Sequence, residues 1–356
     1  MTMPPLANEP FSSPYFRLLQ TPNGGRSLFS TLLIPANTLI HTSYSPSANV
    51  IYREFRKVIC AWCFGYNDEG RSGWCTTGGD GNGRERFCRQ ACRDLWLVEG
   101  MKCGGLREMV DDAICAAVRR ANKAKTKFHQ VPDLGAITRP DTTLGITQAS
   151  LDAAWIAAGC ETTIIIRLDE MELEIARFVS SALVQLYTNA TTSTSFPTTS
   201  KDCRSILSLQ QNELPHTLRR PYILPTHIRV FQFLRTALWH IAEMRPYISL
   251  DTSGNCWVRK ILARDAGNSF GIWEQTQETK KNEDGEMFGW GIWVDASFFN
   301  HSRLSLSRPP IFFGINSWLN QIARQIFLKR VWGALFTSRP TEPSLPGRNF
   351  VLAMSM

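Results

Sequence analysis

Apolar residues recur at three- and four-residue steps through the middle of the chain, and this periodicity predicts helices. The clearest pattern covers residues 227–244, where one face carries Phe231, Leu234, Leu238 and Ile241. Residues 106–127 also have a helical pattern. Residues 150–187 predict one helix, or two separated near Gly159, with an apolar face made of Met171, Phe178, Val179, Ala182, Leu183 and Leu186. The low-complexity residues 188–200 predict a linker.

Short apolar runs bounded by turn residues predict strands on both sides of these helices. Residues 27–34 predict a strand, residues 35–37 supply turn chemistry, and residues 38–40 resume the strand. Residues 254–299 carry glycines and aromatics in short pieces, which favours strands and turns. The Pro- and Ser-rich residues 1–23 predict a loose arm. The expected fold class is therefore α+β.

Composition changes this picture by excluding several protein classes. The chain has 356 residues, of which 43% are hydrophobic and 20% charged, so it can bury a sizeable core and is not disordered overall. No apolar run reaches the roughly 18 residues of a membrane span. Residues 1–14 lack the basic start and apolar stretch of a secretory signal. We therefore expect an intracellular protein of the nucleus or cytoplasm, whose ten cysteines are thiols or metal ligands.

The charge is concentrated at one end of the chain. Of the net +8, the segment 302–356 contributes +6, from seven Lys or Arg residues against one acid, Glu342. The rest of the chain is close to neutral, so there is no strong signal for a nucleic-acid surface. Composition does not indicate an oligomeric state.

Two short-spaced pairs of cysteines are the strongest chemical signal. Cys60 and Cys63 are three positions apart, and Cys88 and Cys92 follow beyond a polar, Gly-rich loop. Two such pairs suit one tetrahedral zinc ion, and because four thiolates fill its coordination sphere, the expected role is structural. Residues 90–98 predict a helix opened by the second pair, with Leu95 and Trp96 packed back on the site.

Other cysteine assignments remain open at this point. The four could be ordinary buried thiols, although their paired spacing disfavours this, and Cys75 or Cys103 could replace one ligand. The remaining cysteines stand alone in the sequence and are better read as small core residues: Cys115, Cys160, Cys203 and Cys256.

Three segments resemble one family. Gly25-Arg26-Ser27-Leu28-Phe29-Ser30-Thr31, followed by Ile34-Pro35-Ala36-Asn37-Thr38-Leu39-Ile40, resembles the N-terminal strand pair of SET domains. Asn268-Ser269-Phe270-Gly271-Ile272 and Ala296-Ser297-Phe298-Phe299-Asn300-His301-Ser302 are similar to two signatures of the SET-and-MYND group. The cysteine cluster lies between the first two segments, where that group inserts a zinc module that splits the SET domain. Such an arrangement is common in fungal SET proteins.

This resemblance implies S-adenosylmethionine-dependent methyl transfer to a lysine of a protein substrate, which could be a histone or another protein. In the family, the backbone at the Gly-x-Gly turn approaches the cofactor, which maps here to Gly25, Arg26, Ser27 and Leu28, with Ser27 in place of the second glycine. The family positions that hold the amino-acid and adenine parts of the cofactor map to Asn268, Asn300 and His301.

The resemblance ends after Ser302. The family pattern continues with Cys and Pro-Asn and ends with a tyrosine beside the methyl group, whereas here Arg303-Leu304 follows and no tyrosine occurs after Tyr247. The Arg- and Pro-rich composition of 303–356 resembles a changed reading frame or a retained intron. Residues 315–336 are also amphipathic and basic, a composition that can bind an anionic membrane surface, although an adventitious segment is the favoured interpretation.

The expected organisation is a SET-type β-fold of short strands that is split by a zinc insert and a helical insert. Its parts are an arm (1–14), the N-terminal SET part (15–59), the zinc-binding insert (60–105), the helical insert (106–250), the C-terminal SET part (251–302) and an atypical tail (303–356).

Two functions remain. The first is a protein-lysine methyltransferase, inactive if the missing tyrosine segment is essential. The alternative is a non-catalytic, zinc-stabilised protein-interaction module. Hydrolase chemistry is disfavoured because Asp111, Asp112 and the acids of residues 170–174 fit solvated helix faces. The Gly-rich residues 78–83 lack the Lys-Ser/Thr of a phosphate loop and fit a loop of the zinc insert.

Overall fold

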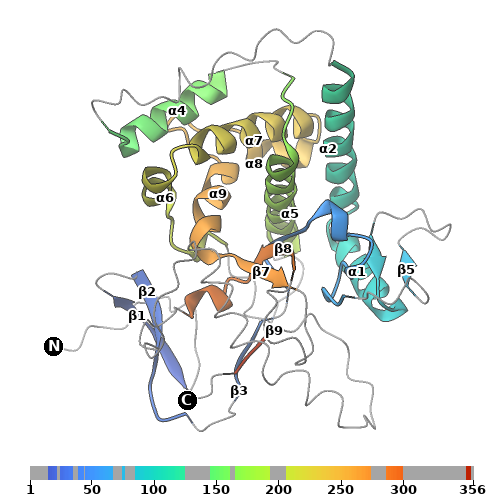
Figure 1. Ribbon diagram of the computed structural model, residues 1–356, viewed down its shortest axis with the longest axis vertical. Coiled ribbons are helices and arrows are strands. Elements are labelled where there is room, and N and C mark those ends of the chain that lie inside the picture. Colours follow the sequence, from blue (N-terminus) through green and yellow to red (C-terminus); the bar gives the residue numbers. More distant parts are fainter. Residues whose placement is uncertain are drawn as a thin grey trace.

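The computed structural model describes eleven stretches of the chain: residues 15–21, 25–34, 39–43, 45–66, 74–76, 85–124, 145–160, 165–192, 206–273, 286–299 and 350–353. Within them, helices and short antiparallel strands are combined, which agrees with the expected α+β class. Figure 1 shows the helices gathered in one half of the molecule and most strands in the other. In the part of the chain described, no helix is long and apolar enough to cross a membrane.

The helical half, here called the helical body, is arranged around two helices, α5 (Glu170–Thr192) and α7 (Ile223–Leu238). Around them pack α2 (Leu106–Lys123), α4 (Gln148–Cys160), α6 (Glu213–Arg219), α8 (Arg245–Ile248) and α9 (Trp257–Asn268), with short 3-10 turns η3 (Ile206–Ser208) and η4 (Ala242–Met244). One continuous core joins these elements, and Trp155, Phe178 and Phe231 are among its largest fully buried side chains. The body therefore has enough buried apolar surface to be stabilised by packing.

A three-stranded antiparallel sheet lies beneath the helical body (Figure 1). Its order is β4 (Ala48–Ile51), β8 (Met287–Ile292) and β7 (Phe270–Trp273). Helix α5 packs on β4, and the Ser181 hydroxyl donates to the Asn49 carbonyl at 2.9 Å. A Cβ at Gly289 would lie 2.1 Å from the Val50 carbonyl oxygen, so only glycine allows β8 to approach β4 this closely.

Two further strand pairs lie at the lower edge in Figure 1. Strands β1 (Phe16–Thr21) and β2 (Gly25–Ser30) form an antiparallel hairpin whose register pairs Leu19 with Ser27. Strand β3 (Leu39–Ser43) pairs with β9 (Phe350–Ala353), so four residues of the tail join a strand from the N-terminal part.

The cysteine-rich segment forms a small unit beside the body. It contains the turn η1 (Arg53–Phe55) leading into it, the two-residue strands β5 (Cys75–Thr76) and β6 (Arg86–Phe87), and helix α1 (Gln90–Lys102). We call residues 60–66, 74–76 and 85–102 the thiol module. Its own apolar cluster is small and centres on Trp62, Phe87 and Trp96, together with Cys60 and Cys92.

Several expectations about helices are confirmed. Helix α2 covers most of residues 106–127, and α4 and α5 are the two helices expected on either side of Gly159. The expected face of α7 is buried, with Phe231, Leu234 and Leu238 fully covered. This helix nevertheless begins four residues earlier, at Ile223, and ends at Leu238, because a 3-10 turn replaces its last stretch.

Four expectations are wrong. Residues 188–192 continue α5, where the Thr188 hydroxyl donates to the Val184 carbonyl, instead of starting a linker. Residues 257–268 form helix α9 instead of strands, because its buried apolar face outweighs the local glycines and aromatics. Residues 16–21 form β1 instead of part of an arm. Met171 is 53% exposed instead of core.

Other expectations concern residues outside the described ones. These are residues 1–14 of the arm, residues 193–200 of the linker, the Gly-rich residues 78–83, and the tail apart from 350–353 with its amphipathic stretch 315–336.

Candidate functional site

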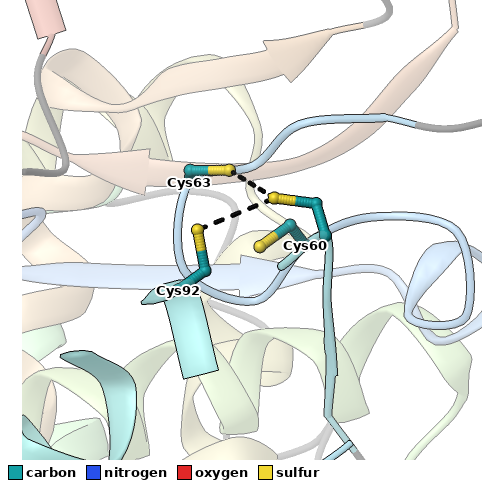
Figure 2. A group of neighbouring side chains, drawn as sticks. Cys60, Cys63 and Cys92 are labelled. Atoms are coloured by element: carbon teal, nitrogen blue, oxygen red, sulfur yellow. Dashed lines mark hydrogen bonds between the residues drawn. The ribbon is translucent and has the colours of Figure 1, made fainter. Parts of the chain in front are cut away.

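The four paired cysteines come together in space. The Sγ atoms of Cys60, Cys63, Cys88 and Cys92 all lie within 4.8 Å of one another. Cys88 Sγ is 3.6 Å from both Cys63 Sγ and Cys92 Sγ. A tetrahedron of thiolates at 2.3 Å from zinc has sulfur–sulfur separations of roughly 3.8 Å. Figure 2 shows the labelled cysteines pointing toward a common centre, so the four can hold a zinc ion.

Local hydrogen bonds place the two pairs. Residues 60–65, which we call the knuckle, form a tight turn in which the Phe64 amide donates to the Cys60 carbonyl at 3.0 Å and the Cys60 amide donates to the Gly65 carbonyl at 2.9 Å. The Ala61 amide ties this turn to Arg86 in β6. Cys92 lies in the first turn of α1, as the spacing predicts.

Aromatic side chains form the apolar surroundings of the cluster. Trp96 is buried with its ring 5.6 Å from that of Phe87, and Leu95 packs against the same cluster, as expected from the sequence. Hydrogen bonds from the other three thiols lower the pKa of Cys60, whereas hydrogen bonding to Cys60 raises the pKa of Cys63 and Cys88. If all four were thiolates, their negative charges would repel one another at these distances, and a bound cation would balance them.

The alternative ligands lie elsewhere. Cys75 Sγ is directed to the Phe87 carbonyl at 3.7 Å, and Cys103 Sγ donates to the Gly100 carbonyl at 2.9 Å in the helical core. Neither belongs to the cluster of four. Of the cysteines expected in the core, Cys256 is buried and accepts from the Arg259 amide, Cys115 is half-buried, and Cys203 lies outside the described residues. Cys160 is exposed, because it ends α4, so that expectation is wrong.

The N-terminal hairpin packs against the turn that leads to Asn300. The guanidinium carbon of Arg26 lies 5.3 Å from the centroid of the Phe298 ring, and the Arg26 side chain donates to the Ser208 carbonyl. The Phe16 ring meets that of Phe299 edge-on at 5.4 Å. Two segments more than 250 positions apart are therefore in direct contact.

Asn268 joins the same region from the helical side. It is the last residue of α9, and its carbonyl accepts from the hydroxyl of Ser297 at 2.9 Å. That hydroxyl also lies 2.9 Å from the Trp293 carbonyl. The Asn268 side-chain amide donates to the carbonyls of Arg264 at 2.6 Å and Gln210 at 3.2 Å. Ser297 thus links the two segments whose sequences resemble signatures of the SET-and-MYND group.

Among the described residues, Arg26 contacts Phe298 and Asn268 is hydrogen-bonded to Ser297, so parts of the three segments lie close together, with two qualifications. Gly25, Arg26, Ser27 and Leu28 form a regular strand instead of a turn, because β1 pairs with them along their length. Asn300 and His301 lie outside the described residues, directly after Phe299. The sequence interpretation missed the partner Ser208 and gave no role to Ser297 and Phe298. Ser297 and Phe298 lie within the segment that resembles the signature, whereas Ser208 carries no sequence signal.

Two of the three acids of α5, Glu172 and Glu174, are buried instead of solvated, which corrects the sequence interpretation, whereas Glu170 is exposed as expected. Glu174 pairs with Arg56 at 2.6 Å and with Arg177 at 3.2 Å, and Glu172 pairs with Arg229 at 2.8 Å. Both carboxylates are almost fully covered. The pairs with Arg56 and Arg229 attach α5 to its neighbours, and both buried carboxylates are held in ion pairs instead of being free for acid–base chemistry.

Comparison with known proteins gives one informative similarity. The chain is 27% identical to the potential protein lysine methyltransferase SET6 of Saccharomyces cerevisiae over 320 residues, which covers 82% of this chain and 79% of that protein. No protein-family model matches the chain. The similarity to the Saccharomyces cerevisiae protein extends over most of the chain and supports a SET-domain family.

Proposed function

We propose that this chain is an S-adenosylmethionine-dependent protein-lysine methyltransferase of the split-SET type, with a structural zinc ion. The observation that carries the proposal is the convergence of the Arg26, Asn268 and Phe298 segments on one region. These are the segments whose sequences resemble cofactor-binding motifs. The similarity to a potential lysine methyltransferase over most of the chain supports the same reading.

The chemistry asked of this site is mainly positioning. The cofactor supplies a methyl group on a sulfonium, and transfer to a neutral lysine amine requires the nitrogen, carbon and sulfur atoms in line. Binding and orientation are therefore the work of the protein. Gly25–Ser30 presents strand backbone at one side of the region, and the end of α9 presents Asn268 at the other.

The hydrogen bonds of Asn268 indicate which of its side-chain atoms could bind the cofactor. Both hydrogens of the amide nitrogen are directed to backbone carbonyls, those of Arg264 and Gln210. The side-chain oxygen is the group left for a ligand, and an oxygen accepts. The side-chain oxygen of Asn268 is therefore suited to accept a hydrogen bond from the ammonium group of the cofactor. The carboxylate of the cofactor needs a donor from another residue. By the resemblance to the SET-and-MYND group, Asn300 and His301 are the candidates for this donor.

A protein-interaction module without catalysis is the second candidate, and one observation favours it. Residues 248–356 contain no tyrosine, although the resembled family has its methyl-side tyrosine after Asn-His-Ser. On this reading the thiol module, residues 60–66, 74–76 and 85–102, is the functional surface and the cofactor region is vestigial. The exposed Val98 and Met101 of α1 would then be part of a contact surface.

Calorimetry with S-adenosylmethionine separates the two functions. The purified chain with one zinc per molecule is titrated, and saturable binding is expected. Ser297→Ala removes the hydroxyl that links the Asn268 and Trp293 carbonyls, so we expect the dissociation constant to rise about tenfold, the equivalent of about 1.4 kcal/mol. Ser150→Ala, at an exposed hydrogen bond far along the chain, is the matched control and should bind like the natural chain.

A methylation assay completes the test. The chain is incubated with labelled cofactor and arrays of lysine-containing proteins, and label transfer to lysine is expected. No saturable binding at millimolar cofactor would contradict the proposal and leave the interaction module. Binding without transfer to any protein would contradict the catalytic half of the proposal and point to the missing tyrosine.

A further inference from the structure

Phe64 has a backbone conformation that its residue type disfavours. Its φ is +60°, and among the described residues it is the sole non-glycine residue with positive φ. The left-handed region costs a residue with a Cβ roughly 1–2 kcal/mol, and a bulky aromatic side chain is seldom found there. Such a conformation persists where the surroundings determine it, and it often marks a functional constraint.

The hydrogen bonds of the knuckle determine the backbone conformation of Phe64. Phe64 follows Cys63 directly, its amide donates to the Cys60 carbonyl, and the next residue, Gly65, accepts from the Cys60 amide. This turn directs both sulfurs of the first cysteine pair toward the cluster of four. Glycine would adopt the same φ without cost, so the ring of Phe64 is not needed to form the turn. The aromatic side chain must therefore be explained by what it contacts.

The Phe64 ring contacts Trp293, outside the thiol module. The two rings meet edge-on with centroids 6.0 Å apart, and Trp293 is almost completely buried. Trp293 also meets Phe270, the residue two positions after Asn268, at 6.3 Å. One tryptophan thus packs between the knuckle and the Asn-Ser-Phe segment.

The backbone of Trp293 continues this path to the proposed cofactor residues. Its carbonyl accepts from both the amide and the hydroxyl of Ser297, each at 2.9 Å. The same hydroxyl is hydrogen-bonded to the Asn268 carbonyl. Displacement of Trp293 would therefore move the turn that holds Ser297 and Phe298 and, with it, the support of Asn268.

We propose that Phe64 is a positioning residue through which the metal-held knuckle fixes Trp293, so that zinc loading and cofactor binding are thermodynamically linked. The inference rests on the proposed function, because it assigns the cofactor to the Asn268 region. Linkage is reciprocal: if zinc tightens cofactor binding by some factor, the cofactor tightens zinc binding by the same factor. The thiol module then acts on the methyl-transfer site in addition to stabilising itself.

The test separates the ring from the turn. Phe64→Gly keeps the left-handed backbone at no steric cost and removes the contact with Trp293, so the variant should still hold one zinc per chain by elemental analysis. We expect its dissociation constant for S-adenosylmethionine to rise about tenfold in calorimetry. Phe64→Tyr keeps a ring in the same place and should restore binding to near the natural value.

A matched control comes from the same unit. The Tyr66 ring, next to the knuckle, stacks on Phe288 at 4.9 Å and so joins the thiol module to the sheet through a different aromatic side chain. Tyr66→Leu should therefore leave the cofactor dissociation constant within about twofold. Cofactor binding by Phe64→Gly that equals that of the natural chain, with zinc retained, would overturn the proposal, as would an equal loss in both variants.

A second measurement uses the natural chain and needs no variant. The affinity for zinc is measured by competition with a chromogenic chelator, with and without saturating S-adenosylmethionine, and is expected to be about tenfold higher with the cofactor. Equal zinc affinity in the presence of bound cofactor would refute the linkage alone. Failure of the natural chain to bind cofactor at all would instead refute the proposed function, so the two failures are distinguishable.

Discussion

The thiol module and the helical body are stabilised in different ways. The body buries one continuous core in which side chains such as Phe231, Leu234 and Trp155 are fully covered. The module has two-residue strands, one helix and a small apolar cluster, two of whose buried members are the cysteines Cys60 and Cys92. The body can be stabilised by packing alone, whereas the module depends on what its sulfur atoms bind.

The sharpest test of this contrast is removal of two ligands. In Cys88→Ser/Cys92→Ser we expect zinc content to fall from one per chain to zero and the module to unfold, because structural zinc supplies about 10 kcal/mol or more in small zinc domains. Helix α1 should become sensitive to proteolysis while the helical body keeps most of its circular dichroism signal. Elemental analysis and limited proteolysis with mass spectrometry measure both effects.

Cys160→Ser is the control for thiol loss, because Cys160 is exposed and lies outside the cluster. It should change neither zinc content nor melting. A double cysteine variant that melts and resists protease like the natural chain would show that packing, and not a metal ion, holds the module.

The converse test damages the body and spares the metal. Phe231→Ala removes a fully buried ring that meets Trp155 edge-on at 5.5 Å, and such truncations cost about 3–5 kcal/mol. Chemical denaturation should show this loss with one zinc still bound per chain. Met171→Ala, at a 53% exposed position on α5, should change the free energy of unfolding by less than about 0.5 kcal/mol. A loss of zinc in Phe231→Ala would show that the two regions do not fold independently.

The sequence predicted most where a local pattern carries the information. Paired spacing identified the four cysteines, because ligands three and four positions apart reach one ion from a single turn. Helical periodicity identified α2, α5 and α7, because the faces of these helices are buried against one another. The proximity of the Arg26 and Phe298 segments was expected from resemblance, and the ring contact between them agrees with it.

The sequence failed where long-range partners decide the outcome. Glu172 and Glu174 have the pattern of a solvated face, yet Arg229 and Arg56 cover them, and each of these arginines is more than 50 positions away. Helix α9 was missed because its apolar face is short, although Ile261 and Leu262 are fully enclosed by the body. The left-handed Phe64 could not be anticipated either, because the contact of its ring with Trp293 is a long-range one.

A smaller difference between the two regions concerns the pH dependence of stability. The helical body buries the carboxyl group of Asp265, which is unfavourable when that group is ionised. Burial raises the pKa of Asp265 from 3.8 to about 6, although the Ser269 hydroxyl and Trp290 act in the opposite direction. Well below pH 3.8 this carboxyl is protonated in both the folded and the unfolded chain. Between pH 4 and 6 the unfolded chain gives up the proton first, so the contribution of Asp265 to stability falls as the pH rises.

Asp265→Asn removes this titration and leaves an oxygen that accepts from Ser269. The free energy of unfolding of the variant, minus that of the natural chain, should therefore increase between pH 4.5 and 7.5 by about 2 kcal/mol, since each pKa unit is equivalent to about 1.4 kcal/mol. Tyr52 faces the same region, but burial raises its pKa to about 12, so it stays neutral throughout this range. Urea denaturation followed by tryptophan fluorescence at the two pH values measures the difference.

Asp251→Asn gives the control of opposite sign. The Asn255 and Ser253 amides donate to the Asp251 carboxylate and lower its pKa. This group therefore stabilises the fold at pH values above its ordinary pKa. The corresponding difference for Asp251→Asn should decrease or stay flat as the pH rises. If Asp265→Asn behaved in the same way, the carboxyl of Asp265 would be solvated and the end of α9 more open than the structure has it. Because Asn268 lies three residues further along this helix, that result would also weaken the positioning of the proposed cofactor site.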